Sequence, residues 1–197
     1  MGLRCEPWAV PWIVVRVIGG SARGRRLRAP KVKGVRPTAD RVREAIFDVL
    51  EHLDAIDGRS VVDLFAGSGA LGIEALSRGA SLVTFVENDK NVVSSIKANL
   101  VSAGFGSSES ARVVNADALS WVAAHPEPFG LVLMDPPYDF QNWSELLEKL
   151  DTAVAVCESN RPIEVSGSLV LHRVYRYGTT LVTVSVTPKR RIEEVLP

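Results

Sequence analysis

Cysteine is scarce in this chain, and its placement argues against two common kinds of small protein. The two cysteines, Cys5 and Cys157, lie far apart in the sequence and close to no other plausible metal ligand. A disulfide-stabilised secreted fold needs several paired cysteines, and a zinc site needs clustered ligands. We therefore expect two inert thiols in a reducing compartment, the cytoplasm, and no metal site.

Long hydrophobic runs are also missing. Nowhere does the chain hold about eighteen consecutive apolar residues, which a membrane-spanning helix requires. Residues 8–15 follow Arg4 and resemble the apolar part of a signal peptide. Pro11 interrupts this segment, however, and no small-residue cleavage site precedes Arg16. We expect neither membrane insertion nor secretion.

An excess of one charge is absent as well, because 23 basic and 23 acidic side chains balance over the 197 residues. Their distribution is nevertheless uneven. Residues 1–43 carry eleven lysines and arginines against Glu6 and Asp40, a net charge of +9, which leaves −9 on the remainder. A basic arm on an acidic body is typical of a protein that binds a polyanion.

The basic arm predicts a hairpin followed by a helix. Strand patterns at Val14–Ile18 and Arg26–Ala29 flank a glycine-rich turn at residues 19–24. After a basic loop at residues 31–37, Thr38 is a suitable N-cap for an amphipathic helix. The apolar face of this helix would hold Val42, Ile46, Val49, Leu50 and Leu53, and its polar face Arg41 and Arg43.

From residue 61 onward, strand and helix patterns alternate, which predicts an α/β fold with a doubly wound, mostly parallel, Rossmann-like sheet. We expect strands at 61–65, 82–86, 112–115, 131–134, 168–171 and 180–186, and helices at 70–78, 92–103, around 119–122 and at 143–156. The predicted organisation is an unmatched N-terminal extension at 1–15, a basic hairpin and helix at 16–57, and the α/β domain at 58–197.

A G-x-G-x-x-G motif at residues 67–72 follows the first strand of this domain and opens a helix. Glu87 ends the next strand, twenty residues after Gly67. The combination fits nicotinamide dinucleotide enzymes, in which the glycine loop holds the diphosphate and the acid binds the ribose. Asp63 argues against that ligand, because a carboxylate close beneath the loop repels phosphate. It suits a ligand with ammonium and sulfonium groups, such as S-adenosylmethionine.

A third acidic residue, Asp117, follows the third strand of the domain. At the carboxyl edge of the sheet its carboxylate can accept a hydrogen bond from an adenine amino group. Each acid alone could simply stabilise a helix N-terminus. Together, Asp63, Glu87 and Asp117 at three successive strand ends favour S-adenosylmethionine, with an NAD-dependent oxidoreductase as the alternative.

An Asp-Pro-Pro-Tyr tetrapeptide at residues 135–138 follows the fourth strand. The two prolines make the loop rigid and leave the Asp135 carboxylate and the Pro136 carbonyl as acceptors. Two acceptors on the N–H groups of a conjugated exocyclic amine would expose the nitrogen lone pair toward a methyl group. Tyr138 can stack on a base that has been extruded from its helix. The tetrapeptide therefore predicts methylation of an amino group on a nucleic-acid base.

Two stretches of the chain resemble known methyltransferase motifs. Residues 132–138 resemble the amino-methyltransferase signature, and residues 63–72 resemble the first motif of class I methyltransferases. The wider resemblance is to the RsmD family, bacterial 16S ribosomal RNA guanine-N2 methyltransferases, and it covers roughly residues 16–140 well and the remainder loosely. The wider resemblance rests on RVIGG at 16–20, GRRL at 24–27, RPTADRVRE at 36–44 and EALSRGA at 74–80.

This resemblance implies a seven-stranded sheet with an antiparallel final strand, an N-terminal hairpin for RNA, and action on 16S ribosomal RNA in an assembled small-subunit particle. We expect a monomer. Cofactor contacts are expected at Asp63, Ala66, Gly67, Ser68, Gly69, Leu71, Glu87, Asn88, Asp117 and Ala118. The target base would meet Asp135, Pro136, Pro137 and Tyr138. RNA contacts are expected at Arg23, Arg25, Arg26, Arg28, Lys31, Lys33, Arg36, Thr38, Arg41 and Arg43.

Two alternatives stay open at this point. The tetrapeptide alone also fits DNA methyltransferases that act on adenine N6 or cytosine N4, and the chain could be a non-catalytic RNA-binding assembly factor. The first fifteen residues match nothing in the family pattern. The segment after Ser168 looks short for two final strands and their connection.

Overall fold

The computed structural model describes residues 12–30 and 40–188 of the chain. Most of the predicted extension, and the predicted RNA contacts Lys31, Lys33, Arg36 and Thr38, lie outside these ranges. The strands are β1 Trp12–Arg16, β2 Arg26–Pro30, β3 Ser60–Leu64, β4 Leu82–Glu87, β5 Ala111–Asn115, β6 Phe129–Met134, β7 Thr152–Ser159, β8 Val170–Tyr177 and β9 Thr180–Val186. The helices are α1 Asp40–His52, α2 Ala70–Ser77, α3 Lys90–Ala103, α4 Ala118–Ala124 and α5 Trp143–Glu148.

The central sheet has seven strands in the order β5-β4-β3-β6-β7-β9-β8. The first five run parallel, whereas β9 is antiparallel to both β7 and β8. This is the predicted doubly wound sheet, and its final strand is antiparallel as expected.

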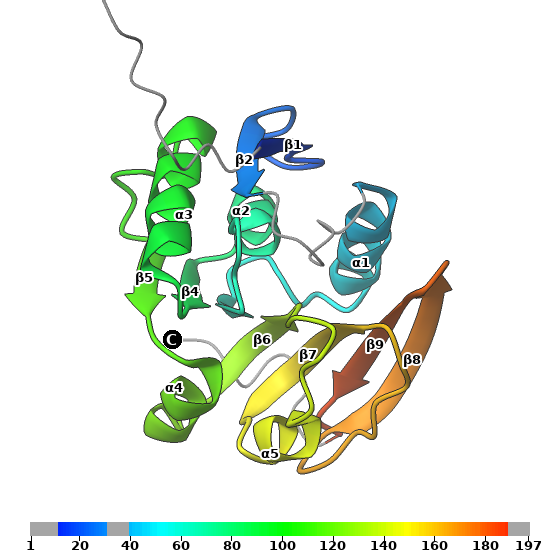
Figure 1. The fold of residues 1–197 in the computed structure, drawn as a ribbon. Helices are drawn as coiled ribbons and strands as arrows, with labels where there is room; N and C mark the ends of the chain where they lie inside the picture. The colour runs from blue at the N-terminus through cyan, green and yellow to red at the C-terminus, as the bar shows by residue number, and fades with distance from the viewer. Residues whose placement is uncertain (1–11, 31–39, 189–197) are drawn as a thin grey trace, which may run out of the picture.

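Helices cover both faces of the sheet: α1, α2 and α3 lie on one face, and α4 and α5 on the other (Figure 1). Successive strand residues point to opposite faces and so join different apolar clusters. Val61 and Leu131 pack in the cluster under the first three helices, whereas Val62 and Val132 pack in the cluster with α4 and α5. Burial on both faces explains why β6 is entirely apolar. None of the helices in the described ranges is long and apolar enough to cross a membrane.

The predicted helix at 143–156 is wrong beyond its first two turns. Helix α5 ends at Glu148, and residues 152–159 form β7, which is buried along its whole length. The leucine spacing around Leu150 imitates a helix, but the alternating small and β-branched residues that follow fill a central strand between β6 and β9. Tertiary pairing therefore decides the structure of this segment.

The C-terminal edge of the sheet is complete, contrary to the expectation that the tail is too short. Strand β8 extends to Tyr177, beyond the predicted end at Leu171, and turns directly into β9. Gly178 adopts φ +63° in this turn, a conformation that glycine accommodates without strain. A tight hairpin thus supplies both strands with few connecting residues.

The N-terminal hairpin, β1 and β2, packs against α2 and α3 rather than extending into solvent. Its inward residues Val17 and Leu27 belong to the same apolar cluster as the sheet face beneath α1. Strand alternation then directs the side chains of Arg26 and Arg28 outward, and both are exposed. The hairpin is therefore basic outside and apolar inside.

Candidate cofactor and substrate pocket

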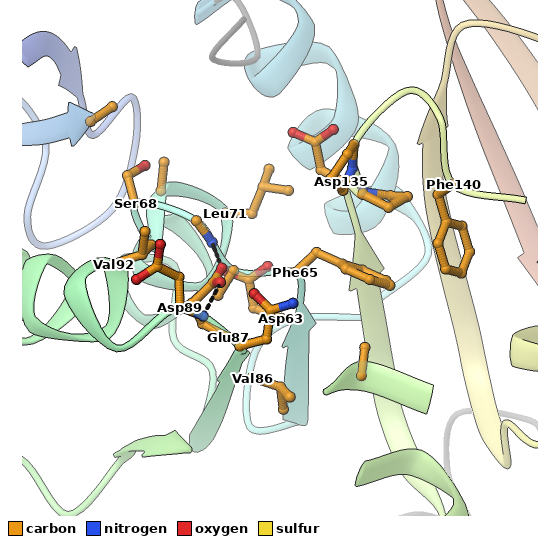
Figure 2. A pocket seen from close by; sticks show the side chains of 18 of the residues that line it. Asp63, Phe65, Ser68, Leu71, Val86, Glu87, Asp89, Val92, Asp135 and Phe140 are labelled. Atoms are coloured by element: carbon orange, nitrogen blue, oxygen red, sulfur yellow. Dashed lines mark hydrogen bonds between the residues drawn. The ribbon is translucent and has the colours of Figure 1, made fainter. Parts of the chain in front are cut away.

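A pocket of about 470 Å³ lies at the carboxyl ends of β3, β4, β5 and β6. Most of its lining residues belong to the ends of these four strands and to the loops that follow them. Asp63, Glu87 and Asp135 are among the lining residues labelled in Figure 2. Chain order reverses between β3 and β6, and open α/β sheets bind ligands at such a switch point. The volume lies within the range of about 300–1,000 Å³ that is usual for small-molecule sites.

The glycine loop forms one wall and has an unusual backbone. Phe65, Gly67 and Gly69 all have positive φ angles, of 59°, 55° and 76°. A bulky side chain such as that of Phe65 rarely adopts this conformation, so the surrounding structure must hold it. The third glycine of the motif serves packing, because a Cβ atom on Gly72 would lie 2.3 Å from the Phe85 ring. Helix α2 can thereby lie directly on β4.

The acid beneath the loop, Asp63, is 1% exposed and accepts a hydrogen bond of 2.9 Å from the Gly72 N–H. Burial raises the pKa of Asp63 well above its usual range, the Gly72 N–H opposes this, and Asp135 and Glu87 raise the pKa further. Burial and repulsion from these two carboxylates therefore disfavour the ionised form of Asp63. A bound cation would stabilise the ionised form of Asp63 and relieve this repulsion.

The other two predicted acids are fixed by the backbone. The Glu87 carboxylate accepts hydrogen bonds from the N–H groups of Gly67 and Asp89, each at 2.9 Å, drawn as dashed lines in Figure 2. Asp117 is the N-cap of α4 and accepts from the Ser120 N–H at 2.9 Å through Oδ1. Carboxylates have further lone pairs, so both residues can still accept hydrogen bonds from a ligand.

The balance of charge in the pocket favours a cationic ligand. Within the described part of the chain, six acidic side chains line it against a single basic one, Arg43. A diphosphate would be repelled by this surface. No cluster of three or more potential metal ligands occurs in the described ranges. The acidic lining residues are Asp63, Glu87, Asp89, Asp117, Asp135 and Asp139.

The Asp-Pro-Pro-Tyr loop forms the opposite wall. Asp135 is half-buried, Pro136 is buried, and Tyr138 is 37% exposed at the rim. The loop closes through a hydrogen bond of 2.9 Å from the Phe140 N–H to the Pro137 carbonyl.

Two contacts fix the far end of this loop. Arg161 donates to the Phe140 carbonyl at 2.8 Å. The Phe140 ring meets the Phe65 ring edge-on at a centroid distance of 5.1 Å. The two walls of the pocket therefore touch through this aromatic pair.

The structure brings almost all predicted cofactor and base contacts into this pocket. Gly69 is the exception, since it is the N-cap of α2 and faces Ile96 and Phe85 instead. Sequence reasoning missed several lining residues that flank the motifs or come from other elements. They are Ala29, Phe65, Ala70, Val86, Asp89, Val92, Ala116, Asp139 and Phe140. Proximity to the motifs was the available signal for most of them, but nothing in the sequence pointed to Ala29.

The prediction that Arg43 lies on the polar face of its helix is wrong. Its side chain is 1% exposed. The guanidinium donates to the Arg16 carbonyl and, at 3.0 Å, to Asp40, and its Nε lies 4.0 Å from Glu74. Long-range acidic and carbonyl partners pull this residue inward, a cause that helical periodicity cannot reveal. Arg41, by contrast, is exposed as predicted.

The four described arginines of the hairpin, Arg23, Arg25, Arg26 and Arg28, are all exposed. They extend from the turn of the hairpin along β2, whose next residue, Ala29, lines the pocket. A polyanion on this surface would therefore lie next to the pocket.

The chain is similar to known proteins along most of its length. A family model described as "Conserved hypothetical protein 95" matches residues 15–186. Ribosomal RNA small subunit methyltransferase D of Escherichia coli is 45% identical over 124 residues, which are 63% of this chain and 60% of that protein. The match thus spans less than two thirds of the E. coli protein. Putative rRNA methyltransferase YlbH of Bacillus subtilis is 37% identical over 183 residues, covering 86% of this chain and 97% of that protein.

The fold is also found in solved structures. A putative methyltransferase from Escherichia coli, yhhF, superposes with a TM-score of 0.77 at 35% identity, over 90% of this chain and 99% of that chain. The fold is that of a class I, Rossmann-like methyltransferase, as the sequence predicted. The chain belongs to the family described as conserved hypothetical protein 95, which is the RsmD family.

Proposed function

We propose that this protein transfers a methyl group from S-adenosylmethionine to the exocyclic N2 of a guanine in 16S ribosomal RNA, within a small-subunit particle. The observation that carries the proposal is one acidic pocket that unites the glycine loop with the Asp-Pro-Pro-Tyr loop. The names of the relatives, which refer to ribosomal RNA, support the choice of substrate.

The residues present fit the proposed cofactor. Asp63 suits the cationic methionine portion, Glu87 the ribose hydroxyls, and Asp117 the adenine amino group. When bound, S-adenosylmethionine supplies an electrophilic methyl group on its sulfonium. The apolar Val86 and Val92 also line the pocket and offer surface on which an adenine ring can pack.

The protein's own contribution to the reaction is to hold and align the amine. The Asp135 carboxylate and the Pro136 carbonyl accept hydrogen bonds from the two N–H groups of the target amine. These bonds direct the nitrogen lone pair toward the methyl. Tyr138, at the exposed rim, stacks on the extruded base. Asp135 can also take up the proton that the nitrogen releases after it is methylated. Alignment of this kind can lower the activation barrier by roughly 7–11 kcal/mol.

A direct assay tests the proposal. The purified protein would be incubated with methyl-labelled S-adenosylmethionine and with 16S ribosomal RNA, small ribosomal subunits lacking the modification, or duplex DNA. Mass spectrometry would then locate the methyl group. Methyl on guanine N2 of the ribosomal RNA is expected. Label in DNA adenine or cytosine would favour the alternative enzyme, and RNA binding without transfer would favour an assembly factor.

Glu87→Ala is expected to weaken S-adenosylmethionine binding by roughly 1–3 kcal/mol, because a charge-assisted ribose contact is lost. The carboxylate also orders the Gly67 and Asp89 N–H groups, so both effects act in the same direction. Calorimetric titration measures the change. Glu109→Ala, an exposed acid outside the pocket, is the control. Unchanged affinity in Glu87→Ala would remove Glu87 from the cofactor site.

The hairpin arginines should contribute phosphate contacts. RNA affinity should fall with salt at a logarithmic slope of roughly −0.7 to −0.9 per neutralised phosphate. Replacing all four described arginines by glutamine should flatten the slope by about three units. Affinity should fall alike for all RNA sequences, while cofactor affinity measured without RNA stays the same. The substituted residues are Arg23, Arg25, Arg26 and Arg28.

A control variant with the same charge change separates local contacts from net charge. It replaces four exposed basic residues elsewhere, Lys97, Arg112, Arg173 and Arg176, by glutamine. Its salt slope should stay close to that of the unsubstituted protein. A hairpin variant that retains both its salt slope and its turnover on small subunits would show that the hairpin only aids solubility.

A further inference from the structure

Asn99 is a buried polar residue on α3 that links the hairpin to the glycine loop. Its Nδ2 donates to the Ser68 carbonyl and to the Arg28 carbonyl, and its Oδ1 accepts from the Arg28 N–H, all at 2.8 Å. Ser68 belongs to the wall of the pocket, and Arg28 belongs to β2. One amide group therefore holds both segments, and Asn99 lies in neither the glycine motif at residues 67–72 nor the tetrapeptide at residues 135–138.

The glycine loop depends on such external support. Positive φ angles at Phe65, Gly67 and Gly69 place much of its backbone in a conformation that costs free energy wherever the residue is not glycine. Hydrogen bonds from the loop N–H groups reach Val86, Glu87 and Ala66. The loop is also supported through one of its carbonyl groups, because Asn99 on α3 donates a hydrogen bond to the Ser68 carbonyl.

The hairpin is fixed at further points to the helix that the same loop begins. Glu74 on α2 accepts the Ile18 and Gly19 N–H groups at 2.7 Å, and Ser77 receives the Ala22 N–H at 2.9 Å. Ala29, directly after the residue that Asn99 holds, lines the pocket. The main chain of Arg28, whose side chain is exposed, and the Ser68 carbonyl in the pocket wall are thus joined through a single amide group.

We propose that Asn99 is a positioning residue that couples the basic hairpin to the cofactor pocket. RNA bound to the hairpin then increases the affinity for the cofactor, and bound cofactor increases the affinity for RNA. The proposal rests on the proposed function, because it takes RNA as the ligand of the hairpin. RNA that restricts β2 also restricts Asn99 and, through it, the Ser68 carbonyl. The conformational cost of ordering the glycine loop is then met before the cofactor arrives.

Coupling of this kind is reciprocal and measurable. The probe is S-adenosylhomocysteine, which cannot be turned over, titrated into the full chain with and without a saturating 16S ribosomal RNA transcript. In the unsubstituted protein we expect RNA to tighten binding at least fivefold, at the lower end of the usual range of about 5–150-fold. By linkage, S-adenosylhomocysteine should tighten RNA binding by the same factor.

Two variants interrupt the link in different ways. Asn99→Ala removes all three hydrogen bonds. Asn99→Asp loses both Nδ2 donors but retains the acceptor for the Arg28 N–H, so it detaches the Ser68 carbonyl and keeps one of the two bonds to Arg28. Ser102→Ala on the same helix loses only a bond to the Ala98 carbonyl within that helix and is the matched control. Circular dichroism would establish that each protein is folded at the temperature of the titration.

In both Asn99 variants the ratio of S-adenosylhomocysteine affinity with RNA to that without RNA should fall close to one. Ser102→Ala should keep the ratio of the unsubstituted protein. A purely structural role for Asn99 would lower stability and leave this ratio intact, which would overturn the proposal. Normal RNA binding with equal cofactor affinities in the unsubstituted protein would also overturn it, without touching the proposed function. Failure of the unsubstituted protein to bind RNA would contradict the proposed function and the coupling together.

Discussion

Asp135→Ala is expected to lower turnover by about 10²–10³-fold, the usual consequence of removing one hydrogen-bonding group aimed at a reacting centre. The residue lies in the pocket wall that faces the glycine loop, where it would accept an N–H of the target amine. Turnover and S-adenosylmethionine affinity would be measured on the same preparation. Asp135→Asn retains one acceptor oxygen and should lose less activity.

Cofactor affinity should survive this substitution. Asp135 is one of the two charges that raise the pKa of Asp63. Removing it lowers that pKa, so Asp63 stays ionised, and able to bind a cation, down to a lower pH. The pH below which cofactor binding weakens should therefore move down in Asp135→Ala. Loss of both turnover and cofactor binding in a folded variant would assign Asp135 to the cofactor site instead. Glu145→Gln, an exposed acid on α5, is the control.

Glu74→Ala is expected to reduce the free energy of unfolding by about 3–5 kcal/mol, since it removes one partner of a buried charge network. Glu74 is fully buried and forms an ion pair of 2.8 Å with Arg78. It also accepts two hairpin N–H groups, which would be left without their acceptor. Domains of this size are typically stable by only about 5–15 kcal/mol, so the loss is large. Urea titration at low temperature would measure it.

Arg78 offers its own matched control. Its second carboxylate partner, Glu51, lies at 2.7 Å but is 53% exposed. Glu51→Ala should cost only about 0–1 kcal/mol, because water screens the pair and solvates what remains. Glu74→Gln, which keeps the shape and one acceptor, provides a milder variant if Glu74→Ala does not fold. Equal small effects at both positions would mean that Glu74 does not anchor the hairpin.

The residues of the pocket could be predicted from the sequence because most of them belong to local motifs. Strand-helix alternation predicts a parallel sheet, and parallel strands of one sheet end at a common edge. Any residue that follows such a strand is thereby brought near the others. Asp63, Glu87, Asp117 and the tetrapeptide at 135–138 each follow or end a strand, so their meeting in one pocket needed no knowledge of side-chain packing.

Tertiary structure alone decided the features that depend on partners distant in the chain. The leucines just before residue 152 have helical spacing and predict that the helix continues. Residues 152–156 nevertheless form a strand, because β6 and β9 both offer backbone hydrogen-bond partners. Helical periodicity places Arg43 on the polar face of α1. Its side chain is nevertheless buried, where it contacts Glu74 and the Arg16 carbonyl. Asn99 is an unremarkable helix residue until folding brings Ser68 and Arg28 to its amide. Local periodicity records which face of an element is apolar, but it holds no information on which distant group will satisfy a buried donor or charge.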